Sequence, residues 1–142
     1  MSTSAPLLDV QHLQVDFRTE DGVVHAVDDV SFQLRPGEVL AVVGESGSGK
    51  SVTAMTLMGL TRSPNAKFGG EADLSGLDLI NASDDELRKV RGKDIAMIFQ
   101  DPMTSLNPVH RIGDQIVEQI QAHEEVSDAQ ARDRVISLLE RV

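Results

Sequence analysis

"VVGESGSGKS", residues 42–51, places a turn of glycine and serine directly after an apolar stretch and ends in one lysine and one serine. Gly44, Gly49, Lys50 and Ser51 match the pattern G-x-x-x-x-G-K-[S/T] in full. Consecutive small residues let backbone N–H groups converge on an anion, because no side chain blocks the concave side. A helix that begins at this point adds free N–H groups and the positive end of its dipole. The stretch therefore predicts a phosphate-binding loop, or P-loop.

The residue types at the end of this loop have separate chemical roles. In a P-loop, Lys50 reaches the outer phosphates and the Ser51 hydroxyl coordinates Mg²⁺. The alternative is an ordinary Gly/Ser loop that matches by accident. Because the match lies between a predicted buried strand and a predicted helix, which is the context that the motif requires, we favour the P-loop.

The segments on either side of the loop predict an α/β fold. Alternating apolar residues predict two antiparallel strands, the first through Leu13 and Phe17 and the second through Val30 and Leu34. The apolar runs "VLAVV" and "DIAMIF" predict two buried strands of a parallel sheet. "SPNAKFGG" is expected to be a loop, and "EADLSGLDL" a short hairpin.

Helices are expected at four places. The first begins with the loop lysine and stops near Gly59. Two capping boxes, Ser83 with Glu86 and Ser127 with Gln130, predict the starts of two more. Another helix is indicated by isoleucines at helical spacing, which are Ile112, Ile116 and Ile120.

Composition limits the class of protein. The chain has 142 residues, the size of one domain, and a net charge of −10 that argues against a nucleic-acid partner. Aromatic residues make up 3%, too few for a base-stacking platform, and the absence of cysteine excludes disulfides and thiolate metal sites. No secretory signal and no run of about 18 apolar residues is visible, so we expect a soluble chain that can still dock on a membrane protein.

Two longer stretches carry a family resemblance. "AVDDVSFQLRPGEVLAVVGESGSGKS" (26–51) and "RGKDIAMIFQDPMTSLNPV" (91–109) resemble the N-terminal half of an ATP-binding-cassette (ABC) transporter ATPase subunit. "IFQDPMTSLNP" is most similar to the ATPases of oligopeptide, dipeptide and nickel importers and their glutathione-importing relatives. The resemblance runs from about Leu8 to the last residue. It implies a P-loop NTPase fold of class α/β, as one partial ABC domain over residues 1–142.

The same resemblance divides this domain into three parts. Antiparallel strands would occupy 8–38, the P-loop core with a partial parallel sheet 39–108, and the start of a helical subdomain 109–142. ATP and Mg²⁺ are the implied cofactors. The residues expected to bind them are Gly44, Glu45, Ser46, Gly47, Ser48, Gly49, Lys50, Ser51, Val52 and Phe17.

Gln100 falls on the family's Q-loop glutamine and is expected to act with Lys50 in catalysis and with Ser51 at Mg²⁺. A neutral carboxamide suits this role, because it ligates a hard cation through its oxygen or donates a hydrogen bond through its nitrogen. Without the upstream P-loop, a glutamine at a strand end would be read as a surface residue.

Phe17 is the nearest candidate for the aromatic residue that the family stacks on adenine. Counting back from Asp28 places Asp21 where that aromatic commonly stands. Phe17 is also spaced like an inward strand residue, so core packing is an equal alternative. His25 is a polar substitute, and base selectivity is left open.

The resemblance also implies protein partners. The segment from Asp101 to Pro108 would receive the coupling helix of transmembrane permease subunits, the alternative being a plain loop. A second ATP-binding subunit would complete the nucleotide site. The chain would then lie at the cytoplasmic face of the inner membrane as a peripheral subunit.

Several motifs of the hydrolytic machinery are missing. The 142 residues contain no "LSGGQ"-type signature, no Walker B strand ending in Asp-Glu and no switch histidine. We therefore expect the N-terminal fragment of an ATPase subunit for peptide uptake, which binds Mg-ATP without efficient turnover. The alternatives are a non-catalytic nucleotide-binding or interaction module and a small P-loop kinase. Two strands before the P-loop and the lack of a following arginine cluster argue against the kinase.

Overall fold

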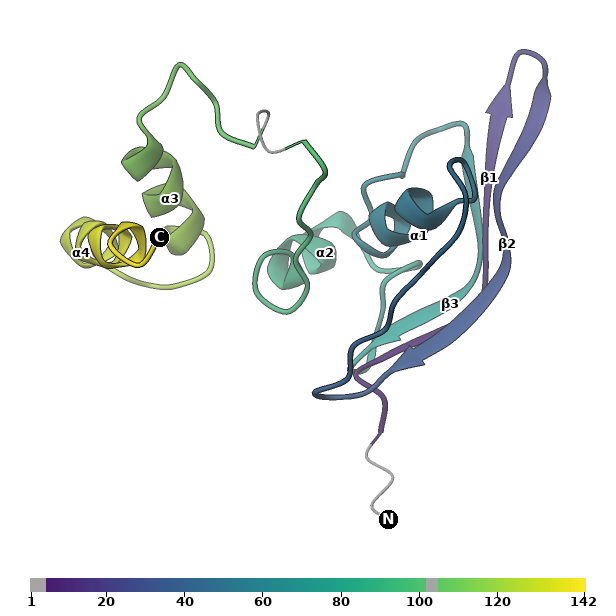
Figure 1. The fold of residues 1–142 in the computed structure, drawn as a ribbon, viewed down its shortest axis with the longest axis horizontal. Helices are drawn as coiled ribbons and strands as arrows, with labels where there is room; N and C mark the ends of the chain where they lie inside the picture. The colour runs from purple at the N-terminus through teal and green to yellow at the C-terminus, as the bar shows by residue number, and fades with distance from the viewer. Residues whose placement is uncertain (1–4, 102–104) are drawn as a thin grey trace. The chain divides into compact units, whose positions relative to one another are not determined.

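The predicted antiparallel strands form two long strands, β1 (Leu8–Thr19) and β2 (Gly22–Leu34), in the computed structural model (Figure 1). The structure describes residues 5–101 and 105–142. The chain divides between Arg91 and Gly92 into two compact units.

The sheet of the first unit has four strands and is antiparallel throughout. β3 (Ala66–Leu74) pairs with the free side of β1, and the short β4 (Leu77–Asp78) pairs with β3, giving the order β2-β1-β3-β4. The predicted hairpin over 71–79 is confirmed, whereas the loop expected over 63–70 is wrong for 66–70, which belong to β3. Phe68 is half-buried in β3, and sheet pairing overrides the two glycines that follow it.

A β-bulge keeps the apolar face of β1 turned inward. Val10 and Leu13 are three residues apart, yet both are buried, with exposed fractions of 1% and 0%. The pairing with β2 shifts between Val10 and Leu13, and the pairing with β3 shifts between Gln11 and Gln14, where His12 adopts a φ of 51°. An odd spacing would put the two side chains on opposite faces of a regular strand, and the extra residue restores the alternation.

Gly70 makes this bulge possible from the neighbouring strand. Its φ is +80°, and a Cβ at this position would lie 2.3 Å from the His12 carbonyl oxygen. Since the obstacle is backbone, no side-chain rotation would relieve the clash. Glycine is therefore required at position 70.

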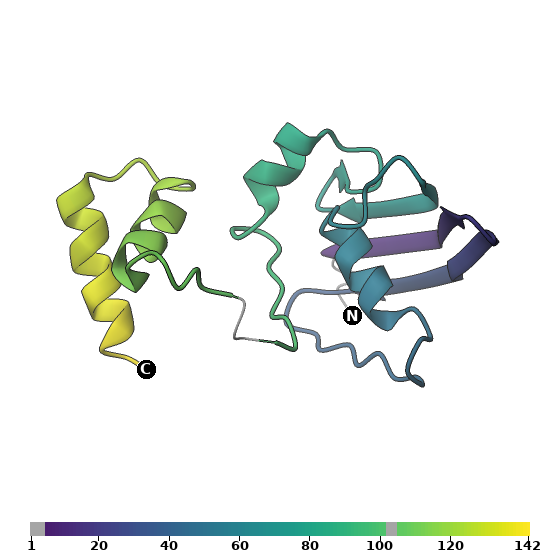
Figure 2. The ribbon, with the colours of Figure 1, turned by 90° about the horizontal axis from the view of Figure 1, so that it is seen from above.

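Two helices complete the first unit. α1 (Lys50–Leu57) lies over one face of the sheet (Figure 2). It ends at Leu57, just before the predicted stop at Gly59, whose φ of +64° allows a Schellman motif in which Gly59 N–H donates to Thr56 O and Leu60 N–H donates to Met55 O. α2 (Asp84–Val90) begins with the predicted capping box.

The second unit contains a helical pair. α3 (Ile112–Gln121) and α4 (Asp128–Leu139) were both predicted, and α4 begins with the expected capping box. Their core consists of Val117, Ala131 and Val135, with Ile116, Ile120 and Val126 packed against it. Arg132 of α4 bonds Asp114 of α3 at 3.1 Å and Asp128 at 2.8 Å.

The two buried parallel strands expected from apolar runs are absent from the described residues. Neither 39–43 nor 94–99 forms a strand, and Val39, Val43 and Ile98 are 94%, 89% and 98% exposed. A strand needs neighbours that accept its hydrogen bonds and cover its faces. Within the described part of the chain no other strand pairs with these segments, so the expected partial parallel sheet is not formed there.

None of the helices in the described ranges combines the length and apolar character needed to cross a membrane.

Asp78 organises the turn from β4 to α2. Its carboxylate accepts hydrogen bonds from Ala72 N–H at 3.3 Å, Ile80 N–H at 3.0 Å and Asn81 Nδ2 at 2.6 Å. Burial raises the pKa of Asp78, but the hydrogen bonds from Asn81, Ile80 and Ala72 outweigh burial and hold the pKa below its ordinary value of 3.8.

Substitution of Gly70 tests the bulge. We expect Gly70→Ala to lower the free energy of unfolding by about 3 kcal/mol or more, because backbone has to move. Gly76→Ala is the matched control, since Gly76 has a φ of +97° but nothing within 4 Å of its added Cβ. It should lose only about 1–2 kcal/mol. Urea unfolding measures both, and equal losses would contradict the proposed clash.

The depressed pKa of Asp78 predicts a pH dependence of stability. Because the folded state holds this carboxylate ionised, its contribution is present above the ordinary pKa of 3.8 and is lost as pH falls through the lower folded-state pKa. Urea unfolding at several pH values should show that Asp78→Asn destabilises the chain at neutral pH and less so in acid. A difference that does not change with pH would contradict this linkage.

Candidate phosphate-binding site

The predicted loop, residues 44–49, leads directly into α1. Lys50 is the first residue of that helix, and Ser51 and Val52 lie in its first turn. The loop residues 44–48 and Ser51 are exposed, while Gly49, Lys50 and Val52 are half-buried. The structure therefore brings all the loop residues predicted from the sequence together at the start of one helix.

Gly49 allows the loop to contact the sheet closely. It is the N-cap of α1 and has a φ of +87°. A Cβ at this position would lie 2.4 Å from the Ala26 carbonyl oxygen and 3.6 Å from Val27 Cγ2. The close approach of two backbone segments fixes where α1 begins relative to β2.

A bulge in β2 presents this carbonyl. Val15 pairs with Val27 and Asp16 pairs with His25, so Ala26 is an extra residue in β2 at that point. The side chains of Asp16 and His25 bond across the pair, with 2.7 Å between Oδ1 and Nδ1. Ala26 is not predictable from the sequence, because it acts through its backbone and its methyl group gives no chemical signal.

Lys50 connects the two ends of the loop. Its Nζ donates to Gly44 O at 2.8 Å, Glu45 O at 2.6 Å and Ser48 Oγ at 3.1 Å. Gly44 leaves the space for this arrangement, since a Cβ there would lie 2.6 Å from Ser48 Oγ. The loop therefore curls around a single positive charge.

The first turn of α1 is left open by its own chain. The helix has no side-chain cap and no acidic residue in its first turn. By contrast, α2 and α4 are capped by Ser83 and Ser127, and each has an acidic residue in its first turn. The first N–H groups of a helix lack intrahelical partners and attract anions. An uncapped helix start that follows a glycine-rich loop is typical of anion-binding sites.

Phe17 lies near the end of β1. It pairs with Val24 of β2 and Ala66 of β3 and is half-buried, two residues after the fully buried Val15. This position is compatible with packing against the sheet. Its stacking on adenine stays a prediction.

The remaining predicted residues belong to the second unit. Gln100 is exposed, and its catalytic and Mg²⁺-binding roles stay predictions. Of the predicted permease-binding segment, residues 102–104 lie outside the described residues. The end of the segment is bonded to α3, because Asn107 N–H donates to Gln115 Oε1 at 2.9 Å and Gln115 Nε2 donates to Asn107 O at 3.0 Å.

Comparison with known sequences identifies similar proteins. A putative peptide import ATP-binding protein of Brucella abortus (strain 2308) is 51% identical over 139 residues, which are 98% of this chain and 42% of that protein. The oligopeptide transport ATP-binding protein OppD of Escherichia coli (strain K12) is 49% identical over 136 residues, which are 96% of this chain and 40% of that protein. The chain thus spans less than half the length of these curated relatives.

Comparison with solved structures finds a similar fold in an ATP-binding cassette. A dimeric ATP-binding cassette in a post-hydrolysis state, bound to ADP and Pi, has a TM-score of 0.75 with 20% sequence identity. The match covers 94% of this chain and 56% of that one. At this identity the likeness concerns the fold alone. In the sequence itself, residues 27–142 match the ABC transporter family, and the chain therefore belongs to that family.

Proposed function

We propose that this chain is the P-loop part of the ATP-binding subunit of a peptide importer, and that it binds Mg-ATP through residues 44–52. The names of the similar proteins from Brucella abortus and Escherichia coli support peptide import. The observation that carries the binding site is the loop curled around Lys50 at the uncapped start of α1.

Each part of this loop has a role in the proposed complex. The N–H groups of the first turn of α1 would donate to phosphate oxygens. Lys50 would neutralise the outer phosphates, and Ser51 would offer its hydroxyl to Mg²⁺. Gly49 keeps the approach to these groups free of a side chain while it holds α1 against β2.

Lys50 has to change partners when a phosphate binds. An ammonium group has three N–H donors, and three acceptors surround Nζ here. We expect the Ser48 hydroxyl, at 3.1 Å the most distant acceptor, to give way to a phosphate oxygen. Binding therefore exchanges one neutral acceptor for a charged one, which forms a stronger hydrogen bond.

Mg²⁺ would enter together with the nucleotide. In the described part of the chain, no cluster of three or more His, Cys, Asp or Glu residues is placed to hold a metal ion. Mg²⁺ in nucleotide sites is commonly bound by phosphate oxygens, water and one or two protein groups, and it neutralises phosphate charge. Ser51 is the protein group that the loop supplies, and Gln100 is the second ligand in this proposal.

Turnover is expected to need more than these residues. The sequence contains no signature motif and no Walker B acidic pair, and positioning of the attacking water is a large part of phosphoryl-transfer catalysis. We propose that a second ATP-binding subunit completes the site, and that permease subunits contact the segment from Asp101 to Pro108. The complex would lie at the cytoplasmic face of the inner membrane.

Replacement of Lys50 tests the site. We expect Lys50→Ala to weaken Mg-ATP binding about 10- to 100-fold, since a charge-assisted hydrogen bond is lost. Lys67→Ala removes an exposed lysine of β3 and should bind like the unaltered chain. Isothermal titration calorimetry measures the affinities, with phosphate release followed in the same samples. An unchanged affinity of Lys50→Ala for Mg-ATP would refute the site, and rapid Lys50-dependent phosphate release would refute the lack of turnover.

Two alanine substitutions in the loop test whether the close contact between Gly49 and β2 positions the loop. Gly49→Ala should raise the Kd for Mg-ATP at least about tenfold, because the added Cβ meets the Ala26 carbonyl and displaces α1. Gly47→Ala is the matched control, with a φ of +82° and nothing within 4 Å of its added Cβ. It should have the smaller effect in the same titration. A larger effect of Gly47→Ala would show that contact with β2 does not position the loop.

A further inference from the structure

The C-terminal end of α1 is held by a residue from another helix. The Schellman motif at Gly59 uses the carbonyls of Met55 and Thr56. The next carbonyl beyond the helix, that of Met58, accepts a hydrogen bond from Arg91 Nε at 2.6 Å. α1 has no basic residue in its own last turn, so Arg91 brings the positive charge that the negative end of a helix favours.

α2 delivers this arginine by packing directly on the end of α1. Arg91 is the C-cap of α2, and its N–H donates to Leu87 O at 2.9 Å. Leu87 is fully buried, and a Cβ added at Gly59 would lie 2.5 Å from its Cδ1 and 2.7 Å from Arg91 Nη2. The absence of a side chain at Gly59 is what lets both groups reach the helix end.

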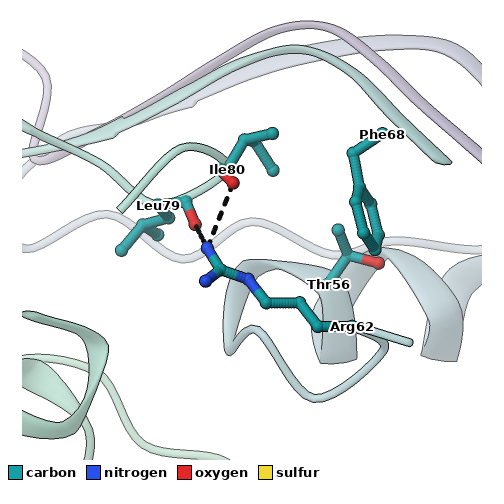
Figure 3. A pocket seen from close by; sticks show the side chains of 5 residues that line it. All are labelled: Thr56, Arg62, Phe68, Leu79 and Ile80. Carbon is teal, nitrogen blue, oxygen red and sulfur yellow. Dashed lines mark hydrogen bonds between the residues drawn. The ribbon is translucent and has the colours of Figure 1, made fainter. Parts of the chain in front are cut away.

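A second arginine also connects the end of α1 with the segment that leads into α2. Arg62, which follows α1, donates from Nη2 to Leu79 O and Ile80 O, both at 3.1 Å (Figure 3). Its Nη1 bonds Asp84 of α2 at 3.2 Å. Arg62 thus joins the end of α1 to the start of α2, while Arg91 joins the end of α2 to the end of α1.

We propose that Arg91 is a positioning residue for the nucleotide site. It would act through α1, whose first turn carries Lys50 and Ser51 and whose C-cap carbonyl, that of Met58, it binds. This inference rests on the proposed function of the loop. It adds that the affinity of the loop for phosphate depends on a hydrogen bond at the far end of the helix.

Because α1 is short, a shift at its C-terminal end would also shift its first turn. With eight residues and a rise of about 1.5 Å per residue, the helix is about 12 Å long, so its two ends are only two turns apart. So short a helix has little stability of its own, and its external contacts determine its placement. Hydrogen bonds to phosphate tolerate only a few tenths of an ångström, so a small displacement at Met58 would weaken those at Lys50 and Ser51.

The test compares substitutions of Arg91 with one of Arg88 in the same helix. The Arg88 side chain is 79% exposed and bonds Asp85 of the same helix, which makes Arg88→Ala the matched control. The Kd for Mg-ATP is measured by calorimetry on the 142-residue chain, at a temperature at which circular dichroism shows every variant folded. Amide hydrogen exchange at Thr56–Leu60 is measured in parallel.

We expect Arg91→Ala to raise the Kd about tenfold, as for loss of one charged hydrogen bond. Exchange at Thr56–Leu60 should be faster, with exchange in β1 unchanged. Arg91→Lys should restore part of the affinity, because its ammonium is still able to donate to Met58 O. Arg88→Ala should bind like the unaltered chain. If Arg91→Ala does not fold, an intermediate Kd for Arg91→Lys with faster exchange confined to Thr56–Leu60 supports the proposal.

Three results would overturn it. Unchanged affinity in folded Arg91 variants would show that α1 is placed without this bond. Faster exchange across β1 as well as α1, with no rescue by lysine, would reduce Arg91 to a general stabilising role. Lack of Lys50-dependent binding in the unaltered chain would overturn the proposed function together with this inference, and it is recognised before any Arg91 variant is made.

Discussion

The site depends on one close backbone approach, in which the Ala26 carbonyl of β2 occupies the space that a side chain at Gly49 would need. A bulge in β2 brings that carbonyl forward, and pairing of β2 with β1 holds the bulge in place. Gly49 in turn is the N-cap from which α1 begins, so the sheet determines where Lys50 stands. Without this contact, every residue of the loop motif would still be present, but the loop would not be held in position against β2.

α1 differs from α2 and α4 in how its ends are satisfied. α2 and α4 cap their own first turns with serine and carry acidic residues there. α1 leaves its first turn open, and at its other end it takes a hydrogen bond from Arg91 of α2. Because the N-cap of α1 is Gly49, the missing side-chain cap costs the helix only roughly a few tenths of a kcal/mol relative to a serine cap. In the proposed function an anion binds at this open start, while Arg91 bonds the C-cap carbonyl of Met58 at the opposite end.

The parts of the structure that were predictable are those that local chemistry decides. The loop motif, the two serine capping boxes and the stop at Gly59 depend on neighbours within a few residues, and all were found from the sequence. The prediction of a strand over 39–43 is wrong, because a buried strand requires partners that the described residues do not supply. The start of β3 was missed because Gly69 and Gly70 resemble a loop, whereas Gly70 is needed to clear the bulge at His12. Ala26 and Arg91 act across long sequence separations, and neither carries a local motif.

In the proposed function, residues 44–52 bind the phosphate chain of a nucleotide. The most direct measurement is an amide ¹H–¹⁵N NMR titration of the chain with Mg-ATP and, separately, with Mg-triphosphate, which lacks the base and sugar. We expect both ligands to shift the amides of residues 44–52, because N–H groups of the loop and of the first turn of α1 would donate to phosphate in each case. Unshifted loop amides in a folded chain, or shifts confined to residues elsewhere in the sheet, would contradict it.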